Sequence, residues 1–269
     1  MNARLIVCDI DNTLVEKHQP LTPRAKKAIE DLKAKGILFG LASGRGNKQL
    51  RLLEKQWDMK CDILIGANGA ELYDGIDEKL ERLYIMKKEW VQECHERFAH
   101  FECDPYVICG DDLYAYDHSS FTSASFLKNE DKPHIVSKAE EFWKEDAVKT
   151  GFRAKEEVID AMEALANQHP SKDYIGFKTE TTMFEFGNAH ASKGALLEYF
   201  CKNHNIPIDS VWAFGDMSND ITLLEAAGVG VCMCNGSEDC KAVADIITEK
   251  PVWEDGWADF VEKHILEKI

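Results

Sequence analysis

Two acids, Asp9 and Asp11, follow an apolar run at residues 5–8 that is typical of a short buried strand. In open α/β sheets, ligands bind outside the carboxyl ends of the strands, so both carboxylates are placed for one shared site. One carboxylate can attack a phosphorus atom while the other transfers protons. The residues alone also allow an exposed turn, in which Asp and Asn make local hydrogen bonds.

A second group of polar residues follows the apolar run at residues 211–214 and contains Asp216, Asn219 and Asp220. Mg²⁺ prefers oxygen ligands, keeps several waters and takes one or two protein carboxylates. This group therefore suits a magnesium site. The alternative is the start of a helix that is capped by Asp216 or Ser218.

Two further positions suit phosphate binding. Ser43 and Gly44 follow a strand predicted at residues 37–42, where a hydroxyl, a bare backbone and the next helix N-terminus can bind a phosphate oxygen. Lys193 opens a predicted helix, where a cation opposes the helix dipole. A residue that opposes a local rule of helix stability in this way is often kept for function, which favours a functional role for Lys193. The common alternatives are a Ser-Gly turn and a solvated lysine.

These positions lie at the ends of segments that alternate between strand and helix. Such repetition predicts an α/β fold with a parallel sheet and crossover helices. In the helix at residues 22–35, Thr22 suits the N-cap and Pro23 the first helical position. Gly36 suits its end. The other predicted segments are strands at residues 4–9, 37–42, 62–66, 211–214, 229–233 and 245–247, and helices at residues 47–55, 192–203, 219–227 and 238–244.

The alternation is interrupted between residues 85 and 186, where the chain is more charged. A hairpin predicted at residues 71–84, with its turn at Asp74 and Gly75, precedes the change. The interrupting segment contains two amphipathic helix candidates and a pair of strands, so we predict an inserted α+β domain. The helices are predicted at residues 89–101 and 156–168, and the strands at residues 174–177 and 183–186.

The chain has 269 residues and a formal net charge of -16. Its length suits one large α/β domain, or a core with a smaller inserted domain. So acidic a protein repels nucleic-acid backbones and anionic membrane surfaces, and we expect neither as a partner. It also repels an anionic substrate, so a phosphate site must gather positive charge from a metal, a lysine or backbone N–H groups. No sequence feature indicates an obligate protein partner.

The 9 cysteines show no paired spacing, so we expect reduced thiols. Cys232 and Cys234, in an apolar run, are interpreted in the same way rather than as metal ligands. The first residues lack the features of a signal peptide, and no apolar run is long enough to span a bilayer. We therefore expect a cytoplasmic protein, in which the acceptor-like triplet Asn235, Gly236 and Ser237 forms only a turn.

Taken in order, the four groups resemble the motifs of the haloacid dehalogenase-like (HAD) phosphatase superfamily. Residues 9–13 resemble its first motif, Ser43 its second and Lys193 its third. Residues 215–220 resemble its fourth. Within the superfamily, the chain is similar to the Cof-type branch, whose cap domain is inserted between the second and third motifs. The resemblance covers residues 5–266, with the cap matched only in position and length.

This resemblance implies a Rossmann-like parallel-sheet core with an inserted α+β cap domain. The HAD-like catalytic core then comprises residues 1–84 and 187–269, and the cap comprises residues 85–186. Caps of this type close over the site and contact the leaving group. Aromatic and basic residues of the segment are candidates for that contact, namely Tyr114, Tyr116, Lys172, Phe177 and Lys178.

The resemblance also implies roles for the site residues in a Mg²⁺-dependent phosphatase. Asp9 is the nucleophile, and Asp11 is the general acid and base. Mg²⁺ is held by the Asp9 carboxylate, the Asp11 backbone carbonyl and Asp216. Asp220 orients a metal-bound water. The oxygens of the transferring phosphate are bound by Ile10, Ser43, Gly44, Lys193 and Asn219.

Asp11 and the place of the insertion separate related activities. Haloacid dehalogenases lack an acid at the position of Asp11 and ion-pumping ATPases have Thr there, so the resemblance implies a phosphatase or a phosphomutase. The large insertion after Ser43 is similar to that of phosphatases, and phosphomannomutases share it. We expect hydrolysis of a small phosphorylated metabolite, such as a sugar phosphate. The alternatives are a phosphomannomutase-like enzyme, a pyridoxal phosphate or flavin mononucleotide phosphatase, and a regulatory protein that keeps the fold to bind a ligand.

Overall fold

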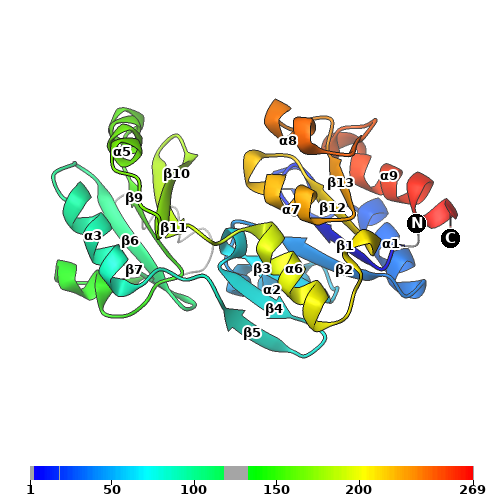
Figure 1. Ribbon diagram of the computed structural model, residues 1–269, viewed down its shortest axis with the longest axis horizontal. Helices are drawn as coiled ribbons and strands as arrows, with labels where there is room; N and C mark the ends of the chain where they lie inside the picture. The colour runs from blue at the N-terminus through cyan, green and yellow to red at the C-terminus, as the bar shows by residue number, and fades with distance from the viewer. Residues whose placement is uncertain (1–2, 18, 118–132, 269) are drawn as a thin grey trace. The chain divides into compact units, whose positions relative to one another are not determined.

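The structure is a computed structural model that separates into two compact units, each with a sheet of its own (Figure 1). Unit 1 comprises Met1–Glu81 and Ser192–Ile269. Unit 2 comprises Arg82–Ala191. The residues that the structure describes are 3–17, 19–117 and 133–268.

Unit 1 is built on a sheet with the strand order β14-β13-β12-β1-β2-β3-β4-β5. Neighbouring strands from β14 to β3 are parallel, and β4 is antiparallel to β3. This parallel sheet confirms the predicted α/β class. The strands are β1 (Leu5–Cys8), β2 (Leu38–Ala42), β3 (Ile63–Gly66), β4 (Glu71–Asp74), β5 (Lys79–Arg82), β12 (Val211–Gly215), β13 (Val229–Cys232) and β14 (Ile246–Ile247).

The chain changes its direction of travel across this sheet at β1. From β1 it proceeds to β2 and β3 on one side, and later it returns at β12 on the other side. All four residues of β1 are buried, as a continuous apolar run in a central parallel strand predicts. Ligands of such sheets bind outside the carboxyl ends of the strands at this switch point. The acids of the first and fourth motifs follow β1 and β12.

The helices of unit 1 lie close to their predicted positions. The Thr22 hydroxyl caps α1 by accepting a hydrogen bond from the Ala25 N–H at 3.1 Å, and Pro23 opens the helix. The helix predicted at residues 219–227 is a single 3-10 turn, η5, followed by a short α7. The sequence patterns did not predict α9. The bounds are α1 (Pro23–Ala34), α2 (Asn47–Gln56), α6 (Lys193–Asn203), η5 (Ser218–Asp220), α7 (Ile221–Ala226), α8 (Glu238–Val243) and α9 (Gly256–His264).

Helices pack on this sheet and bury its strands. Ile6 of β1 and Leu32 of α1 belong to one buried hydrophobic cluster, which α9 also joins. The ring of Trp257, on α9, lies edge-on to those of Phe39 and Phe214, with centroids 5.8 and 6.0 Å away. The helices α6 and α7 lie together in front of the sheet in Figure 1. This packing fixes the strand ends from which the acidic residues extend.

Unit 2 contains a second sheet, with the strand order β10-β11-β9-β6-β7-β8. Its neighbouring strands are antiparallel except β7 and β8, which are parallel. The sequence predicted α3, α5 and the pair β10 and β11, but not β6, β7, β8 or β9. The bounds are α3 (Lys88–Phe98), β6 (Asp104–Cys109), β7 (Asp112–Tyr116), β8 (His134–Val136), η3 (Ala139–Trp143), β9 (Lys149–Arg153), α5 (Glu156–Gln168), β10 (Tyr174–Glu180) and β11 (Met183–Asn188).

An aromatic core joins α3 and α5 to one face of the unit 2 sheet. The Phe98 ring of α3 lies with its centroid 5.6 Å from that of Phe152 and 5.3 Å from that of Phe186. His95 is buried in this core, where its Nε2 lies 2.8 Å from the Thr150 hydroxyl. Burial lowers the pKa of His95 to about 3, so the ring is neutral at pH 7.

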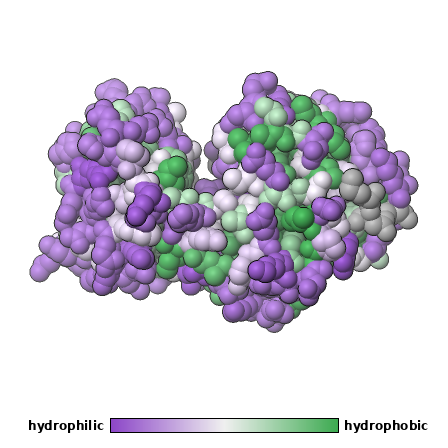
Figure 2. All heavy atoms as spheres, viewed as in Figure 1, coloured by the Kyte–Doolittle hydropathy of each residue, from purple (hydrophilic) through white to green (hydrophobic). Residues whose placement is uncertain are grey.

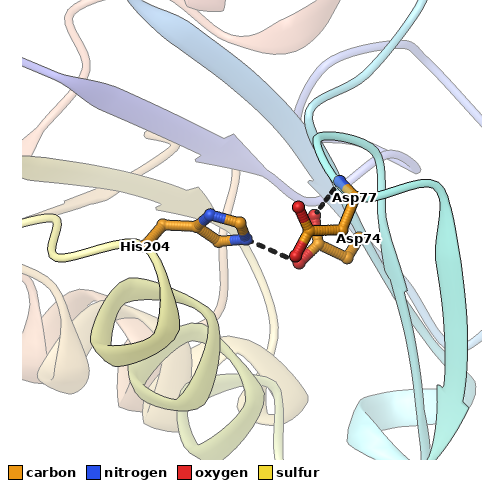
Figure 3. Close-up of side chains that lie close together, drawn as sticks. All are labelled: Asp74, Asp77 and His204. Carbon is orange, nitrogen blue, oxygen red and sulfur yellow. Dashed lines mark hydrogen bonds and ion pairs between the residues drawn. The ribbon is translucent and has the colours of Figure 1, made fainter.

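A polar contact fixes the end of α6 to the hairpin of β4 and β5 (Figure 3). His204, the residue after α6, places its Nε2 atom 2.6 Å from the Oδ2 of Asp74. The Oδ1 of Asp74 accepts hydrogen bonds from the N–H groups of Ile76 and Asp77 at 3.0 and 3.1 Å. Both oxygens of Asp74 therefore have protein partners within this turn and at the end of α6.

The visible surface of each unit is largely hydrophilic, with smaller hydrophobic patches (Figure 2). This distribution fits a chain in which charged residues make up 30% and hydrophobic residues 45%. Among residues 3–17, 19–117 and 133–268, no helix is both long enough and apolar enough to cross a membrane.

Candidate active site

The pairing of β1 with β12 brings Asp9 and Asp216 together. The two strands are parallel, with Cys8 opposite Phe214, and the Asp9 N–H donates to the Phe214 carbonyl at 2.9 Å. Asp9 directly follows β1, and Asp216 directly follows β12. Both residues are buried. The first and fourth motifs are therefore side by side at the same edge of the sheet.

Lys193 reaches these acids from the first position of α6. The helix is capped by Ser192, whose hydroxyl accepts a hydrogen bond from the Ala195 N–H at 3.1 Å. The Lys193 Nζ donates to Asp9 Oδ1 at 2.7 Å and also to Asp220 Oδ1. The side chain of Lys193 is 0% exposed. The interpretation of Lys193 as a solvated surface lysine is therefore wrong.

Two glycines allow the start of α6 to approach its neighbours this closely. A Cβ on Gly194 would lie 2.1 Å from the Thr222 carbonyl oxygen on α7. Gly69 has a φ of 101°, and a Cβ there would lie 2.2 Å from the Ser192 carbonyl. Only glycine avoids both clashes, because any other residue brings a Cβ. These contacts fix the position from which Lys193 extends.

Asp220 connects Lys193 to the loop that carries Asp216. Its Oδ2 accepts hydrogen bonds from the N–H groups of Asp216 and Met217 at 3.0 and 3.1 Å, while its Oδ1 accepts from Lys193. Asp220 is 0% exposed. A Cβ on Gly215 would lie 2.4 Å from the Asp220 Cβ, so the chain can turn here only with glycine. Asp220 thereby fixes both the Lys193 ammonium and the loop that carries Asp216.

The site carries more negative than positive charge. Burial raises the pKa of Asp216 to about 6, although the Thr13 hydroxyl, which donates to its Oδ1 at 2.7 Å, lowers it in part. Burial also raises the pKa of Asp9, against the attraction of Lys193. Burial alone would lower the pKa of Lys193, but the Asp220 and Asp9 carboxylates outweigh it and raise that pKa. Three buried carboxylates thus share one ammonium, and a bound cation would favour their ionised forms.

The Asp11 side chain is held by Arg45, two residues after Ser43. Arg45 Nη2 lies 2.8 Å from both carboxylate oxygens of Asp11, and Arg45 Nε lies 3.2 Å from Oδ2. This two-pronged contact fixes the orientation of the carboxylate. Arg45 was not predicted as a site residue, because its partner lies 34 residues away in the chain.

The loop between β2 and α2 holds Ser43 and Gly44 against the end of β3 and the turn that follows it. The Ser43 N–H donates to the Ile65 carbonyl at 2.8 Å, and the Ser43 carbonyl accepts from the Asn68 N–H at 3.0 Å. The Ser43 hydroxyl accepts from the Arg45 N–H at 3.3 Å. A Cβ on Gly44 would lie 3.3 Å from the Asn68 amide. Asn68 therefore lines the loop that the sequence predicted to bind phosphate.

Two other predicted phosphate ligands differ in their surroundings. Asn219 is exposed, and its Nδ2 donates to the Asn68 Oδ1 at 3.1 Å. Asn68 itself has a left-handed backbone, with a φ of 54°. The side chain of Ile10 is buried in the hydrophobic cluster of unit 1, so only its backbone is available to a phosphate.

Asp9, Asp216 and Asp220 suit a metal ion. Each offers one carboxylate oxygen, and these oxygens all lie within 4.8 Å of one another. Oxygen donors and an excess of negative charge are what Mg²⁺ requires. The Asp11 carboxylate is instead paired with Arg45, which leaves the Asp11 backbone carbonyl as the atom predicted to bind the metal.

The five residues of unit 2 that were predicted to contact a substrate differ in their position relative to its sheet. Tyr114 and Tyr116 pack against the aromatic core on the helix-covered face, and Lys178 forms an ion pair with a residue of α5. Side chains alternate along a strand, so Phe177 lies on the opposite face. Lys172 is exposed in the loop before β10. Contact of any of these five residues with a substrate stays a prediction.

Comparison with known proteins adds a family and several relatives. A family model described as haloacid dehalogenase-like hydrolase matches residues 6–261. YcsE of Bacillus subtilis (strain 168), named a 5-amino-6-(5-phospho-D-ribitylamino)uracil phosphatase, is 25% identical over 268 residues, which cover 99% of this chain and 97% of the relative. YbhA of Escherichia coli (strain K12), named a pyridoxal phosphate phosphatase, is 25% identical over 282 residues, which cover 99% of this chain and 100% of the relative.

Solved structures show the same fold. The crystal structure of TM0651 from Thermotoga maritima matches with a TM-score of 0.87 and 22% identity, over 99% of this chain and 97% of that one. A haloacid dehalogenase-like hydrolase from Bacteroides thetaiotaomicron matches with a TM-score of 0.84 and 21% identity, over 97% of this chain and 99% of that one. These matches extend over nearly the whole chain and confirm the predicted fold class.

Proposed function

The chain belongs to the haloacid dehalogenase-like hydrolase family, and on that premise we propose that it is a Mg²⁺-dependent phosphatase that acts through a phospho-aspartate on Asp9. One observation carries the proposal. The Lys193 ammonium is buried between Asp9 and Asp220, beside Asp216, at the switch point of the sheet. Such a group can hold an anionic phosphate against an anionic nucleophile, which a solvated turn cannot.

In the proposed reaction, an Asp9 oxygen forms a bond to phosphorus while the bond between phosphorus and the leaving oxygen breaks. Asp11 donates a proton to that leaving oxygen, so the product departs as a neutral alcohol. Asp11 then takes a proton from a water whose oxygen attacks the phosphorus, which releases phosphate and restores the Asp9 carboxylate. The contact with Arg45 holds the Asp11 carboxyl group in one orientation, as a group that transfers protons at a fixed position requires.

We assign the metal site to Asp9, Asp216 and the backbone carbonyl of Asp11. Mg²⁺ supplies positive charge there that offsets the repulsion between a carboxylate and a phosphate dianion. Asp220 is predicted to orient a metal-bound water. Its hydrogen bonds to Lys193 and to the loop of Asp216 support an additional role in fixing both groups.

The transferring phosphate needs donors for its oxygens as charge spreads over them. The predicted donors are backbone N–H groups, a hydroxyl, an amide and the buried ammonium. We assign this binding to the Ile10 and Gly44 backbones and to the side chains of Ser43, Lys193 and Asn219.

We propose that the substrate is a small soluble metabolite with a phosphate monoester. The names of two relatives, which refer to a ribitylaminouracil phosphate and to pyridoxal phosphate, support this class, and sugar phosphates and flavin mononucleotide belong to it as well. The net charge of -16 disfavours nucleic acids and anionic membranes as partners. We further propose a cytoplasmic location, a core of residues 1–84 and 187–269, and a cap function for residues 85–186.

The proposal is tested by a screen over phosphorylated metabolites with and without Mg²⁺, in which free phosphate and isomerised product are both measured. We expect release of phosphate only with Mg²⁺, and poor activity with Ca²⁺, which is larger and prefers more ligands. Asp216→Asn should weaken the response to Mg²⁺. Isomerised product without free phosphate would favour a phosphomutase. Full activity in the presence of a chelator would contradict the metal site.

A further inference from the structure

The triplet Asn235, Gly236 and Ser237, which the sequence predicted as a turn, comprises the second half of a turn and the N-cap of α8. It connects β13 to α8, and the Gly236 N–H closes it by donating to the Met233 carbonyl at 2.8 Å. All three residues of the triplet contact one of two loops in the active site. The triplet is therefore more than a connection between two elements.

Asn235 binds the loop that contains Asp11. Its Nδ2 donates to the backbone carbonyl of Asn12 at 2.9 Å, and its Oδ1 accepts from the Val252 N–H at 2.9 Å. Asn12 has a left-handed backbone with a φ of 66°, which few residues other than glycine adopt readily. The amide of Asn235 thus fixes the left-handed backbone next to Asp11, and the Val252 N–H fixes the amide.

Gly236 and Ser237 contact the loop that contains Asp216. The Ser237 N–H donates to the Asp216 carbonyl at 2.8 Å, and the Ser237 hydroxyl approaches the same oxygen at 3.3 Å. A Cβ on Gly236 would lie 2.7 Å from that carbonyl oxygen. The Asp216 carbonyl is therefore held by the hydrogen bond from Ser237 and by its close contact with Gly236.

A third contact closes a ring of interactions. The Thr13 hydroxyl, one residue after Asn12, donates to Asp216 Oδ1 at 2.7 Å. The ring then runs from the turn to Asn12, through Thr13 to Asp216, and back to the turn. Because of this ring of contacts, neither the loop that contains Asp11 nor the loop that contains Asp216 can shift without breaking a hydrogen bond.

We propose that the Asn235-Gly236-Ser237 turn is a positioning element that fixes the Asp11 backbone and Asp216 relative to each other for metal binding. This inference rests on the proposed function, because it assumes that these two residues share a cation. Residues that orient metal ligands typically change metal affinity by about 10- to 100-fold when they are removed. Loss of the Asn235 amide should therefore weaken Mg²⁺ binding rather than only lower stability.

The experiment measures Mg²⁺ binding by calorimetry in the absence of substrate, together with thermal unfolding of the metal-free protein. The test variant is Asn235→Ala. Asn188→Ala is a matched control in unit 2, because Asn188 Nδ2 donates to the Ile85 carbonyl at 2.9 Å and its Oδ1 accepts from the His190 N–H at 2.9 Å. Both variants lose the same two kinds of hydrogen bond, so both should lower the melting temperature of the metal-free protein.

Of these two variants, Asn235→Ala alone should raise the dissociation constant for Mg²⁺, by about tenfold. Gly236→Ala, which places a Cβ against the Asp216 carbonyl, should act in the same direction. Ser237→Ala keeps the backbone N–H and should change the constant little. Equal Mg²⁺ affinity in wild type, Asn235→Ala and Gly236→Ala would overturn the positioning role. If wild type and Asp216→Asn bind Mg²⁺ equally, the metal site of the proposed function fails instead.

Discussion

Both units contain a lysine whose Nζ lies 2.7 Å from a buried carboxylate. In unit 1 the pair is Lys193 with Asp9, and in unit 2 it is Lys149 with Glu185. The first pair lies at the carboxyl ends of parallel strands. The second lies within antiparallel strands, on β9 and β11.

The two pairs differ in what surrounds the carboxylate. In unit 1, Lys193 is shared between Asp9 and Asp220, and Asp216 adds a third buried acid. In unit 2, Glu185 also accepts a hydrogen bond from the Tyr106 hydroxyl. Burial and the charge of Glu185 raise the pKa of Tyr106, so the hydroxyl keeps its proton and donates it.

This comparison separates a site for chemistry from a structural ion pair. A carboxylate matched by one ammonium and one neutral donor is already satisfied, and breaking such a pair mainly costs stability. Three carboxylates around one ammonium remain short of positive charge, so a metal ion can enter as a further partner. We therefore expect substitutions in unit 1 to affect turnover and equivalent substitutions in unit 2 to affect stability.

The largest effect is expected from Asp9→Asn. The amide keeps the shape of the side chain but cannot attack phosphorus, so turnover should fall by at least about a thousandfold, or about 4 kcal/mol of barrier. The metal-free variant should be at least as stable as wild type, because one of three crowded carboxylates is removed. Phosphate release and chemical unfolding measure the two effects. Near-normal turnover would contradict nucleophilic attack by Asp9.

A smaller and more selective loss is expected from Asp11→Asn. General acid–base catalysis is typically worth about 10²- to 10⁴-fold, so turnover of a sugar phosphate should fall by that factor. A nitrophenyl phosphate has a leaving group that departs without protonation, so its first step should be much less affected. Comparison of the two substrates in single-turnover experiments tests this. An equal loss for both would mean that Asp11 is structural or binds the metal through its side chain.

In unit 2, Glu185→Gln should lower stability and leave turnover near the wild-type level. Loss of a hydrogen bond to a charged group costs about 2 kcal/mol, and the ammonium of Lys149 is left without its carboxylate. Asp160→Asn is the control, because the Asp160 side chain pairs with Lys178 but is 57% exposed, and an exposed pair contributes about 0–1 kcal/mol. A loss of turnover in Glu185→Gln as severe as in Asp9→Asn would remove the distinction between the units.

The neutral His95 makes unit 2 sensitive to acid. Its pKa is about 3 in the folded protein and 6.5 in the unfolded chain, so the unfolded state binds more protons between these values. Stability is therefore lost as the pH falls, by about 2 kcal/mol between pH 7 and pH 5. Chemical unfolding at several pH values should show a weaker dependence for His95→Gln.

His100→Gln, at an exposed position of the same unit, should keep the wild-type pH dependence. An NMR titration of His95 in the wild type gives a direct check, because no change of its ring signals is expected above about pH 4. A midpoint near 6.5 would show that burial does not hold the ring neutral.

The sequence predicted those parts of the fold in which local pattern and final packing agree. The strand β1 is an apolar run buried on both faces, and α1 has its N-cap at Thr22. The strand β9 was missed because its five residues include Gly151 between charged ends, so its pattern is visible only in the assembled sheet. The α9 helix follows Asp255, whose left-handed backbone is not evident from the residue type.

Within the site, the positions at strand ends were predictable because the carboxyl ends of parallel strands meet at one edge. The side-chain partners of those residues were not predictable. The contact between Arg45 and Asp11, and that between Thr13 and Asp216, depend on side-chain directions that spacing does not fix. The same limit applies to Glu185, whose pairing with a lysine depends on strand register.

The most direct test of the proposed mechanism is to trap the phosphorylated enzyme by rapid acid quench with a ³²P-labelled nitrophenyl phosphate. Asp11→Asn should accumulate the label, because it can no longer activate the hydrolytic water, and peptide mapping should place the label on Asp9. Asp9→Asn should remain unlabelled. If wild type releases phosphate while Asp11→Asn carries no label, or carries it on another residue, the phospho-aspartate on Asp9 is contradicted.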